Sequence, residues 1–582
     1  TRLNHIKILF FIGVNDGVVP KAGNAGGIIS QFEREKMAAC HLELAPGARE
    51  KVFIQRFYLY LNVTKPSDFL YVTFSKVNAD GKALRRSYFV GTLLKMFPEK
   101  TVEEIGETTS ADCIMTPESS MAFFLEGLQD EAWSGENEKT ASGEDQTEEK
   151  LSKPAKKEVW NALAKFYLSD ENWKEEADRL LKASYVVHSD EPISHAVTQA
   201  LYGTVLENSV TRLERFAACA YAHYLNYGLR LKERQLLEFA SVDMGNIYHD
   251  ALEHFSRRVE KSEYTWFNIP EDVQETFIEE SMNDAIAGCK NAGAFENVRN
   301  RYLTGRMRQT IKRTVWALTT QIQKGKFVPS DFEVSFSRAD KLDAIRFQLS
   351  DEEKMNLLGR IDRVDTYETS DKVYVKIIDY KSGNTSFSLV NLYHGLQLQL
   401  VVYMNAALEL EEKRHPGKKA EPAGIFYYHI QNPIVDGLGN ETEAEIRNSV
   451  LEQLKLNGLV NDDPEIYEAM DSDFAGNSSV IPIGKKTDGS LKATSKVAST
   501  YDFSVMSDYV QEKIKETGKK IFAGDISIHP YSLDGKSGCD YCPYHTVCGF
   551  DTRMPGYSYH KLEKFDSADE ILKRMENEKQ EQ

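Results

Sequence analysis

The sequence predicts an α/β fold of several domains. Residues 6–14 form one continuously apolar run, which is typical of a buried parallel strand. Residues 355–367 and 372–381 are rich in β-branched and aromatic side chains and are separated by a polar turn, so they predict an antiparallel hairpin. Residues 390–411 have the pattern of a helix. A length of 582 residues is enough for about three or four domains.

The first part of the chain, residues 1–110, has an α/β pattern. Its apolar run ends in a polar loop at residues 15–20, where an α/β sheet commonly faces a ligand. A second strand is predicted at residues 69–75, and a helical stretch extends to about residue 97. The motif Gly-x4-Gly-Lys-Ser/Thr, which binds nucleotide phosphates, does not occur in the sequence. We therefore expect no ATP hydrolysis from this part of the protein.

The rest of the chain divides into three predicted segments. Residues 111–204 form a connecting region, in which residues 134–157 are rich in Glu, Ser and Lys and predict a disordered or exposed linker. Residues 205–565 form one large domain, and residues 566–582 a charged, solvated helix. Because the chain does not begin with Met and opens almost directly into a strand, we expect it to be a fragment of a longer protein.

A pair of carboxylates and a lysine on the hairpin indicate a metal site. On a strand, alternate residues share a face, so Asp379 and Lys381 point into one volume. Folding of the hairpin brings Asp362 beside Asp379. Two carboxylates held this close repel each other, and a bound Mg²⁺ or Mn²⁺ removes the penalty. Asp-x-Lys alone is more often a surface ion pair, so the interpretation depends on what surrounds it.

Further polar residues make the pattern specific. Gln399 and Tyr403 are four apart on one face of the predicted helix. With Asp362, Asp379 and Lys381, and with His249 four residues after Gly245, they resemble the PD-(D/E)xK nuclease core of the RecB type. The resemblance implies a metal held by His249, Asp362, Asp379 and the carbonyl group of Tyr380. It also implies the catalytic residues Asp362, Asp379, Lys381, Gln399 and Tyr403.

Lys381 would orient the attacking water and offset the charge that develops on phosphorus. Gln399 and Tyr403 would position this lysine or the DNA. Glu333, on a predicted strand at residues 332–336, is a further candidate carboxylate, although an ion pair at the strand edge is the interpretation we favour from the sequence.

Three of the seven cysteines, Cys539, Cys542 and Cys548, lie in one short segment. This spacing allows their thiolates to converge on one soft metal centre. Structural zinc ions and cubane clusters both usually take four ligands. The spacing leaves three candidates for the fourth ligand: Cys219, Cys289 and His545.

A cysteine before the nuclease core and three after it resemble the iron–sulfur staple of the AddB family of helicase–nuclease subunits, and residues 214–234 are similar to that family's sequence at this place. The resemblance implies a [4Fe–4S] cluster on Cys219, Cys539, Cys542 and Cys548, with zinc as the alternative. The family usually has Pro after the first cysteine, whereas this chain has Ala220. The resemblance also identifies residues 1–110 as the end of a superfamily 1 helicase-like domain.

The same resemblance implies an AddA-type partner subunit, a single DNA strand as the substrate, and a role in double-strand break processing. Two alternatives are a non-catalytic scaffold that guides DNA and a stand-alone nuclease of the same superfamily. The full set of site residues disfavours the scaffold, and the helicase-like segment disfavours the stand-alone nuclease. Clustered thiols and the lack of a long apolar run predict a cytoplasmic location and no membrane partner.

A net charge of −18 argues mildly against indiscriminate nucleic-acid binding. A local exception lies in residues 298–315, where basic residues occur with no acidic residue between them. As a helix, this segment would offer a positive ridge to DNA phosphates, but a solvated face paired with acidic neighbours is an equally supported interpretation. The candidate DNA-binding residues are Arg299, Arg301, Arg306, Arg308, Lys312 and Arg313.

Overall fold

The computed structural model describes residues 4–21, 30–42, 44–78, 82–104, 114–133, 153–232, 234, 241–289, 298–336, 345–435, 441–472 and 474–580. The chain forms two compact units, Thr1–Leu180 and Leu181–Gln582. This division differs from the boundaries at residues 110 and 204 that we proposed from the sequence. In the described part of the chain, no helix combines the length and the apolar character needed to cross a membrane.

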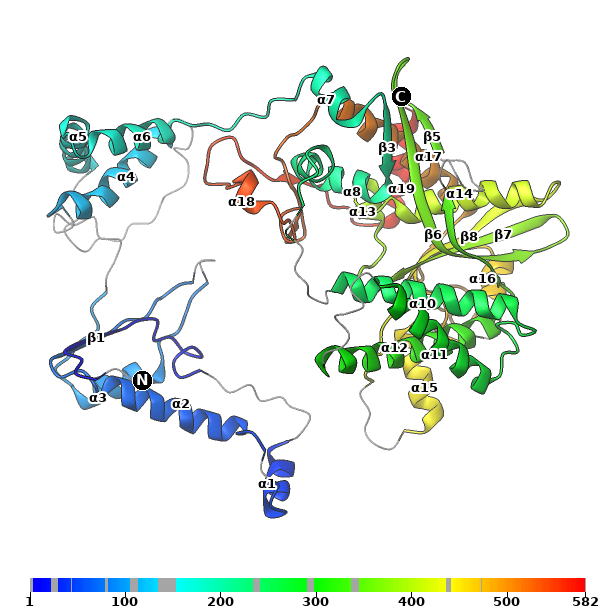
Figure 1. The fold of residues 1–582 in the computed structure, drawn as a ribbon, viewed down its shortest axis with the longest axis horizontal. Helices are drawn as coiled ribbons and strands as arrows, with labels where there is room; N and C mark the ends of the chain where they lie inside the picture. Colours follow the sequence, from blue (N-terminus) through cyan, green and yellow to red (C-terminus); the bar gives the residue numbers. More distant parts are fainter. Residues whose placement is uncertain are drawn as a thin grey trace. The chain divides into compact units, whose positions relative to one another are not determined.

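The first unit contains a two-stranded parallel sheet made by β1 (Ile8–Phe11) and β2 (Phe69–Val72) (Figure 1). The parallel pairing was expected, but the burial was not, because Phe10 is 65% and Ile12 is 73% exposed. Among the described residues β1 has a single partner strand, and the small core lies around Val14 at the end of the apolar run. The helices, the last of which crosses into the second unit, are α1 (Gln31–Ala39), α2 (Ala48–Val63), α3 (Tyr88–Met96), α4 (Pro117–Trp133), α5 (Lys153–Ser169) and α6 (Lys174–Ser184).

Part of the predicted linker is helical. Residues 134–152 lie outside the described residues, but residues 153–157 form the start of α5. An aromatic anchor accounts for this helix, since Trp160 stacks on Phe124 of α4 with 5.9 Å between ring centroids and donates its indole N–H to the Phe124 carbonyl group at 2.9 Å. The low apolar content of residues 134–157 therefore does not extend to the helix that follows them.

The second unit is built on an eight-stranded mixed sheet with the order β10-β9-β8-β7-β6-β3, and β4 and β5 also pair with β6. The predicted hairpin is confirmed as an antiparallel pair of β6 and β7, and β7 pairs in parallel with β8. The strands of this sheet are β3 (Val205–Ser209), β4 (Val328–Phe336), β5 (Ile345–Gln348), β6 (Lys354–Glu368), β7 (Lys372–Lys381), β8 (Lys419–His429), β9 (Asn457–Asn461) and β10 (Val497–Ala498).

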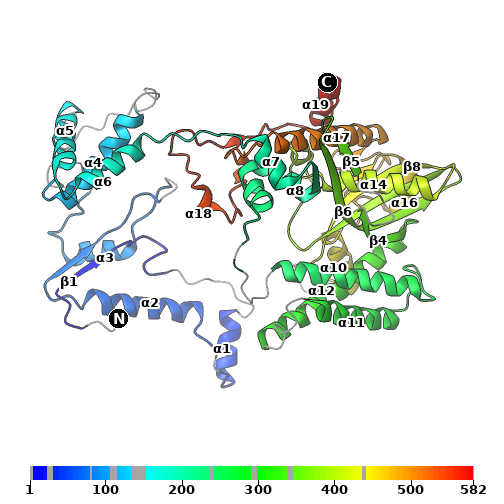
Figure 2. The same ribbon diagram turned by 45° about the horizontal axis from the view of Figure 1, so that its top comes forward.

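Helices cover both faces of this sheet, as Figures 1 and 2 show. One core joins the sheet to α8, α14, α17 and α19, and the other joins it to α10, α11, α12 and α16. A small sheet of β11 (Tyr531–Leu533), β12 (Lys536–Ser537) and β13 (His560–Lys561) lies near the C-terminus. The helical elements are α7 (His195–Tyr202), α8 (Val210–Ala218), α9 (Ala220–His223), the π-helix η2 (Tyr224–Gly228), α10 (Ser241–Lys261), α11 (Glu271–Gly288), α12 (Val298–Gln323), α13 (Leu389–Tyr393), α14 (Gln399–Arg414), α15 (Glu443–Gln453), α16 (Pro464–Met470), α17 (Thr500–Phe522), α18 (His545–Cys548) and α19 (Ala568–Gln580).

Two helix predictions require correction. The helix predicted at residues 390–411 is interrupted between α13 and α14, where Gly395 adopts a left-handed conformation with φ of 76°. Gln399 is consequently the first residue of α14. The C-terminal helix α19 is not fully solvated, because Ile571 and Met575 are buried in the core against α17 and α13.

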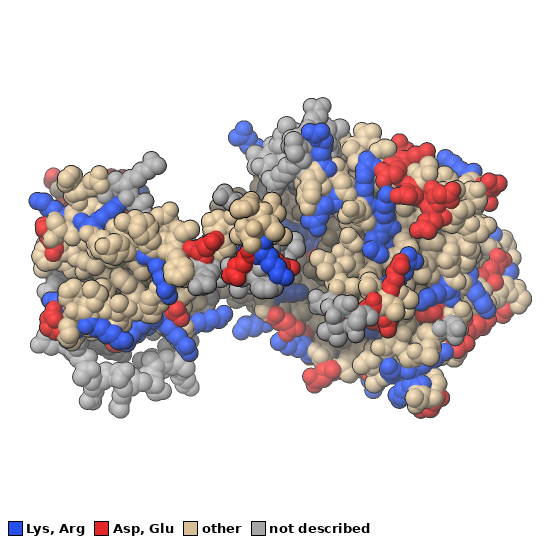
Figure 3. Space-filling view, turned by 90° about the horizontal axis from the view of Figure 1, so that it is seen from below, with Lys and Arg blue, Asp and Glu red and all other residues tan. Residues whose placement is uncertain are grey.

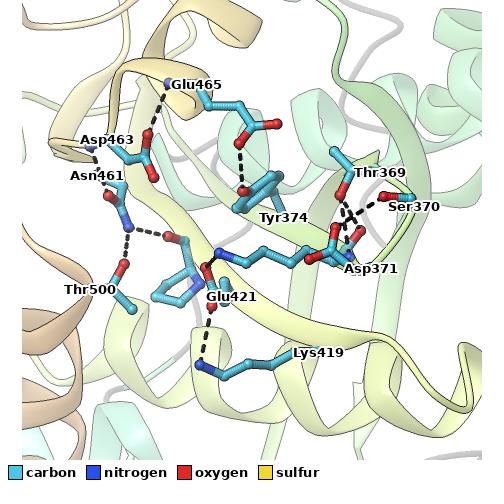
Figure 4. Close-up of polar contacts among 12 residues, drawn as sticks. Thr369, Ser370, Asp371, Tyr374, Lys419, Glu421, Asn461, Asp463, Glu465 and Thr500 are labelled. Carbon is cyan, nitrogen blue, oxygen red and sulfur yellow. Dashed lines mark hydrogen bonds and ion pairs between the residues drawn. The ribbon is translucent and has the colours of Figure 1, made fainter.

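A polar network fixes the end of the sheet where β7 begins (Figure 4). The side-chain amide of Asn461, which is fully buried, donates to the Pro422 carbonyl group at 2.8 Å and to the Thr500 hydroxyl at 2.9 Å. Its carbonyl oxygen accepts the Asp463 N–H at 3.0 Å. The network therefore joins β8, β9 and α17 through one side chain.

We expect Asn461→Ala to destabilise the second unit by about 2–4 kcal/mol, because each buried polar group left without a partner costs about 1–3 kcal/mol. Urea denaturation measures this difference. Ser370→Ala is the matched control, since Ser370 is exposed and its hydroxyl binds only the neighbouring Asp371 at 3.1 Å. Equal urea midpoints for the two variants would contradict the prediction.

Candidate active site and cysteine centre

The candidate active site lies where strands β6 and β7 separate. Their antiparallel pairing ends at Arg363 and Ile378, so Asp362 and Asp379 are the first residues beyond the last paired positions. Both side chains are buried, with 7% and 2% of their surface exposed. The Tyr380 N–H donates to Asp362 Oδ2 at 2.7 Å, which fixes this carboxylate across the gap between the strands. The hairpin therefore brings the two predicted carboxylates to one place.

Helix α10 places His249 against this gap. His249 Nδ1 lies 3.3 Å from Asp362 Oδ2. Gly245 is one helical turn earlier on the same face, and a Cβ atom there would lie 3.2 Å from the Ser382 hydroxyl oxygen at the end of β7. The glycine of the Gly-x-x-x-His pattern thus allows α10 to approach the site closely, and the histidine one turn later reaches the carboxylate.

Glu333 is the residue to which sequence reasoning gave too little weight. In the antiparallel pairing of β4 with β6 it stands opposite Asp362, between the paired residues on either side. Its Oε1 atom lies 4.0 Å from His249 Nδ1, and its Oε2 atom forms an ion pair with Arg360 at 2.5 Å. Its backbone has φ of 52°, a conformation that is unfavourable for a residue with a side chain and is often retained at functional sites.

Lys381 is held by three neighbours. Its Nζ atom lies 2.6 Å from Asp379 Oδ2 and donates to Gln399 Oε1 at 3.1 Å. Gln399 in turn donates from Nε2 to the Tyr403 hydroxyl at 2.9 Å. The ammonium group also lies 5.1 Å from the centre of the Tyr427 ring. The structure therefore brings together all five residues that we predicted to be catalytic, and it joins four of them in one polar chain.

The site concentrates negative charge in a buried space. Burial, followed by the charge of Asp362, raises the pKa of Glu333 to about 7 and that of Asp379 to about 6, although Lys381 opposes the effect on Asp379. Burial acts to lower the pKa of His249, but its hydrogen bond to Asp362 and the charge of that carboxylate outweigh burial and raise it. A cation bound here would relieve this repulsion.

The residues present fit a divalent cation. In the described part of the chain, His249, Glu333 and Asp362 are the His, Cys, Asp and Glu side chains whose ligand atoms gather in a group of three, all within 4.8 Å of one another. Imidazole and carboxylate ligands suit Mn²⁺ and, for the carboxylates, Mg²⁺. Asp379 is not in this group, since its carboxylate pairs with Lys381. The predicted ligands Asp379 and the Tyr380 carbonyl group therefore remain predictions.

The cysteine residues form a second centre. Cys219 caps the C-terminus of α8, and Cys542 packs with it around Ala222 and Tyr544. Burial raises the pKa of Cys539 to about 11, and the nearby thiolates of Cys219, Cys542 and Cys548 raise it further in the same direction, in that order after burial. Four thiols are thus within electrostatic reach of one another.

The two other candidate ligands lie elsewhere or are engaged. Cys289 packs against the core on the α10 face of the sheet, separate from the cysteine centre. His545 binds the Cys539 carbonyl group through Nε2 at 2.8 Å. Cys219 therefore has the best position among the three candidates for the fourth ligand.

The cysteine centre fits an iron–sulfur cluster better than one zinc ion. Among the described residues, no three of these thiols lie within 4.8 Å of one another, whereas zinc at about 2.3 Å from each sulfur holds the sulfurs roughly 3.8 Å apart. The Phe550 N–H donates to Cys548 Sγ at 3.4 Å, and the Arg215 guanidinium lies 4.0 Å from Cys542 Sγ. Such donors stabilise the sulfur ligands of an anionic cluster.

The basic helix α12 is partly neutralised by α11. Lys312 forms ion pairs with Glu275 at 2.6 Å and Glu279 at 3.3 Å. Arg308 also pairs with Glu279, and it donates to Asn283 at 2.6 Å. These contacts favour the solvated-face interpretation for two of the predicted DNA-binding residues. On the face in Figure 3, basic side chains lie among acidic ones.

The other predicted DNA-binding residues differ in their surroundings. The Arg313 guanidinium lies 5.2 Å from the Trp316 ring centre, Arg301 and Arg306 are exposed, and the Arg299 side chain lies outside the described residues. DNA binding by these four arginines stays a prediction.

Comparison with known proteins agrees with the geometry. Residues 207–549 match the model of the PD-(D/E)XK nuclease superfamily. Proteins named as the AddB subunit of an ATP-dependent helicase/deoxyribonuclease are 36% identical in Lachnoclostridium phytofermentans, over 97% of this chain and 47% of that protein, and 32% identical in Clostridium tetani, over 100% and 49%. The corresponding values in Bacillus cereus are 31%, 99% and 49%. These matches confirm the resemblance to the AddB family, and the chain spans about half the length of these curated relatives. The chain belongs to the PD-(D/E)XK nuclease superfamily.

Proposed function

We propose that this chain hydrolyses phosphodiester bonds in DNA with the help of a divalent metal ion. The observation that carries the proposal is the buried group of His249, Glu333 and Asp362 beside the Lys381–Asp379 pair. Carboxylates in a space this enclosed need a cation to offset their charge, and the lysine beside them provides the second component of a phosphodiester-cleaving site.

His249, Asp362, Asp379 and the carbonyl group of Tyr380 would hold Mg²⁺ or Mn²⁺, and Glu333 lies close enough to join them. When bound, the ion would polarise the phosphoryl oxygen and lower the pKa of a water molecule. Lys381 orients the attacking water and offsets charge on phosphorus, while Gln399, anchored by Tyr403, holds the lysine in place. A point charge on a flexible stem suits this task.

The names of the relatives suggest the setting. We infer that the complete protein is a subunit of a helicase–nuclease complex with an AddA-type partner, in which this site cuts, as an exonuclease, a single strand released by unwinding. Processing of double-strand breaks in the cytoplasm would be its role. Residues 1–110 would be the end of a helicase-like domain without ATPase activity of its own, and a [4Fe–4S] cluster on the four cysteines would staple the nuclease domain.

Cleavage of end-labelled single-stranded DNA by the anaerobically purified chain tests the proposal. We expect degradation with Mg²⁺ or Mn²⁺ and none with a chelator, and the end label distinguishes exonuclease from endonuclease products. If the metal-loaded chain binds DNA but leaves it intact with both ions, and also when an AddA-type motor subunit is added, the protein is a scaffold and the proposal is wrong.

A further inference from the structure

Glu214 is a buried carboxylate close to the candidate active site, and the catalytic scheme above does not use it. It lies on α8 with Leu213 and Ala217, which face the core against β6, α14 and α17. A carboxylate on such an apolar face requires a partner. The pKa of Glu214 is raised to about 7 by burial, although two backbone hydrogen bonds and Lys381 act in the opposite direction.

The partners of Glu214 are the first backbone N–H groups of α14. Its Oε1 atom accepts the Leu398 N–H at 2.8 Å and the Gln399 N–H at 3.1 Å. The N-cap residue of α14, Leu398, makes no capping bond with its own side chain. Because the first N–H groups of a helix have no partner within the helix, Glu214 supplies from α8 the cap that the local sequence lacks.

This cap acts on the catalytic lysine through one residue. Gln399 is held by its backbone to Glu214 and by its side chain to Lys381, with 3.1 Å between Gln399 Oε1 and Lys381 Nζ. A shift of the first turn of α14 would therefore move the amide oxygen that orients the ammonium group. Displacements well below 1 Å are sufficient to impair a catalytic constellation.

The residue next to Glu214 reaches the cysteine centre. Arg215 lies 4.0 Å from Cys542 Sγ, and the same helix ends at Cys219. Gly395, in the loop before α14, also packs against α8, since a Cβ atom there would lie 3.4 Å from Ala217 Cβ. Helix α8 is thus fixed at one end by the cysteines, while its middle holds the start of α14.

We propose that Glu214 is a positioning residue that aligns Lys381 through Gln399, and that α8 makes this alignment depend on the cysteine centre. The proposal rests on the proposed nuclease function. It assigns to the staple a specific consequence for the active site, beyond holding the ends of the domain together.

The test compares Glu214→Ala with Glu214→Gln in the full chain. We expect Glu214→Ala to lower kcat about 10–100-fold with little change in KM, as is usual when a residue that orients a functional group is removed. Glu214→Gln should retain most of the activity, because an amide oxygen accepts the same two N–H bonds. Both variants should keep the metal content of the cysteine centre, and Glu512→Ala, exposed on α17, is the control.

Hydrogen exchange provides a second readout that does not depend on activity. The Leu398 and Gln399 amides should exchange faster in Glu214→Ala than in the unchanged chain, and Cys548→Ala should accelerate the same amides. Unchanged exchange at these two amides in Glu214→Ala would overturn the positioning role. Acceleration in Glu214→Ala but not in Cys548→Ala would overturn the dependence on the cysteines. If the unchanged chain does not cleave DNA, the nuclease proposal fails, while the exchange data still decide the positioning role.

Discussion

Asp379→Asn is expected to reduce DNA cleavage by about 10²–10⁴-fold, because a few kcal/mol of transition-state stabilisation are lost with one carboxylate at the metal site. The substitution keeps the size of the side chain and an oxygen that can accept from Lys381, which now lies 2.6 Å from Asp379 Oδ2. Rates of single-strand cleavage under metal saturation measure the effect. Asp371→Asn, on the exposed turn of the same hairpin, is the control, and equal rates for the two variants would contradict the prediction.

The same variant should be more stable than the unchanged chain when metal is removed. The folded-state pKa of Asp379, about 6, exceeds the ordinary value of about 3.9. A group with a raised folded pKa contributes stability below its unfolded pKa, and that stability is lost as the pH rises through the folded pKa. Between about pH 4 and pH 6 the metal-free chain should therefore lose up to about 3 kcal/mol relative to Asp379→Asn. Urea denaturation in chelator across this pH range measures the difference, and parallel stability profiles would contradict it.

Cys219→Ser should remove the metal centre, whereas Cys289→Ser should leave it intact. Cys219 and Cys539 are 320 positions apart, and the chain-entropy relation for cross-links gives about 5 kcal/mol for a loop of this length. We therefore expect loss of bound iron and a large fall in the urea midpoint for Cys219→Ser alone. Iron and zinc analysis of anaerobically purified protein measures the first effect. Retention of the metal in Cys219→Ser and its loss in Cys289→Ser would reverse the assignment.

The hairpin and its carboxylates could be predicted because the signals are local. Strand periodicity places Asp379 and Lys381 on one side, and the polar turn defines how β6 and β7 pair. The interruption before α14 was missed, although Gly395 was a visible signal, because helical periodicity continues on both sides of it. Local patterns therefore gave the elements, and single glycines decided where they ended.

The remaining site residues depend on contacts between distant elements. Glu333 faces Asp362 only because its backbone is left-handed, which no neighbouring residue indicates. Glu214 had one readable signal, a carboxylate on an apolar helix face, but its partner on α14 is 184 residues away. The acidic residues of α11 that neutralise Arg308 and Lys312 are likewise separated in sequence from the basic helix.

The pairing of β3 with β6 has a consequence for the order in which the domain is made. Val205 lies opposite Lys354, a residue 149 positions later in the chain, and synthesis of that interval takes roughly 7–30 s at 5–20 residues per second. Cys219 waits for Cys539 still longer, roughly 16–64 s at the same rate. During this time β3 has an unpaired edge, which is a template for wrong pairing. Helix α8 thus emerges early from the ribosome but reaches its final environment only when nearly the whole domain has been synthesised.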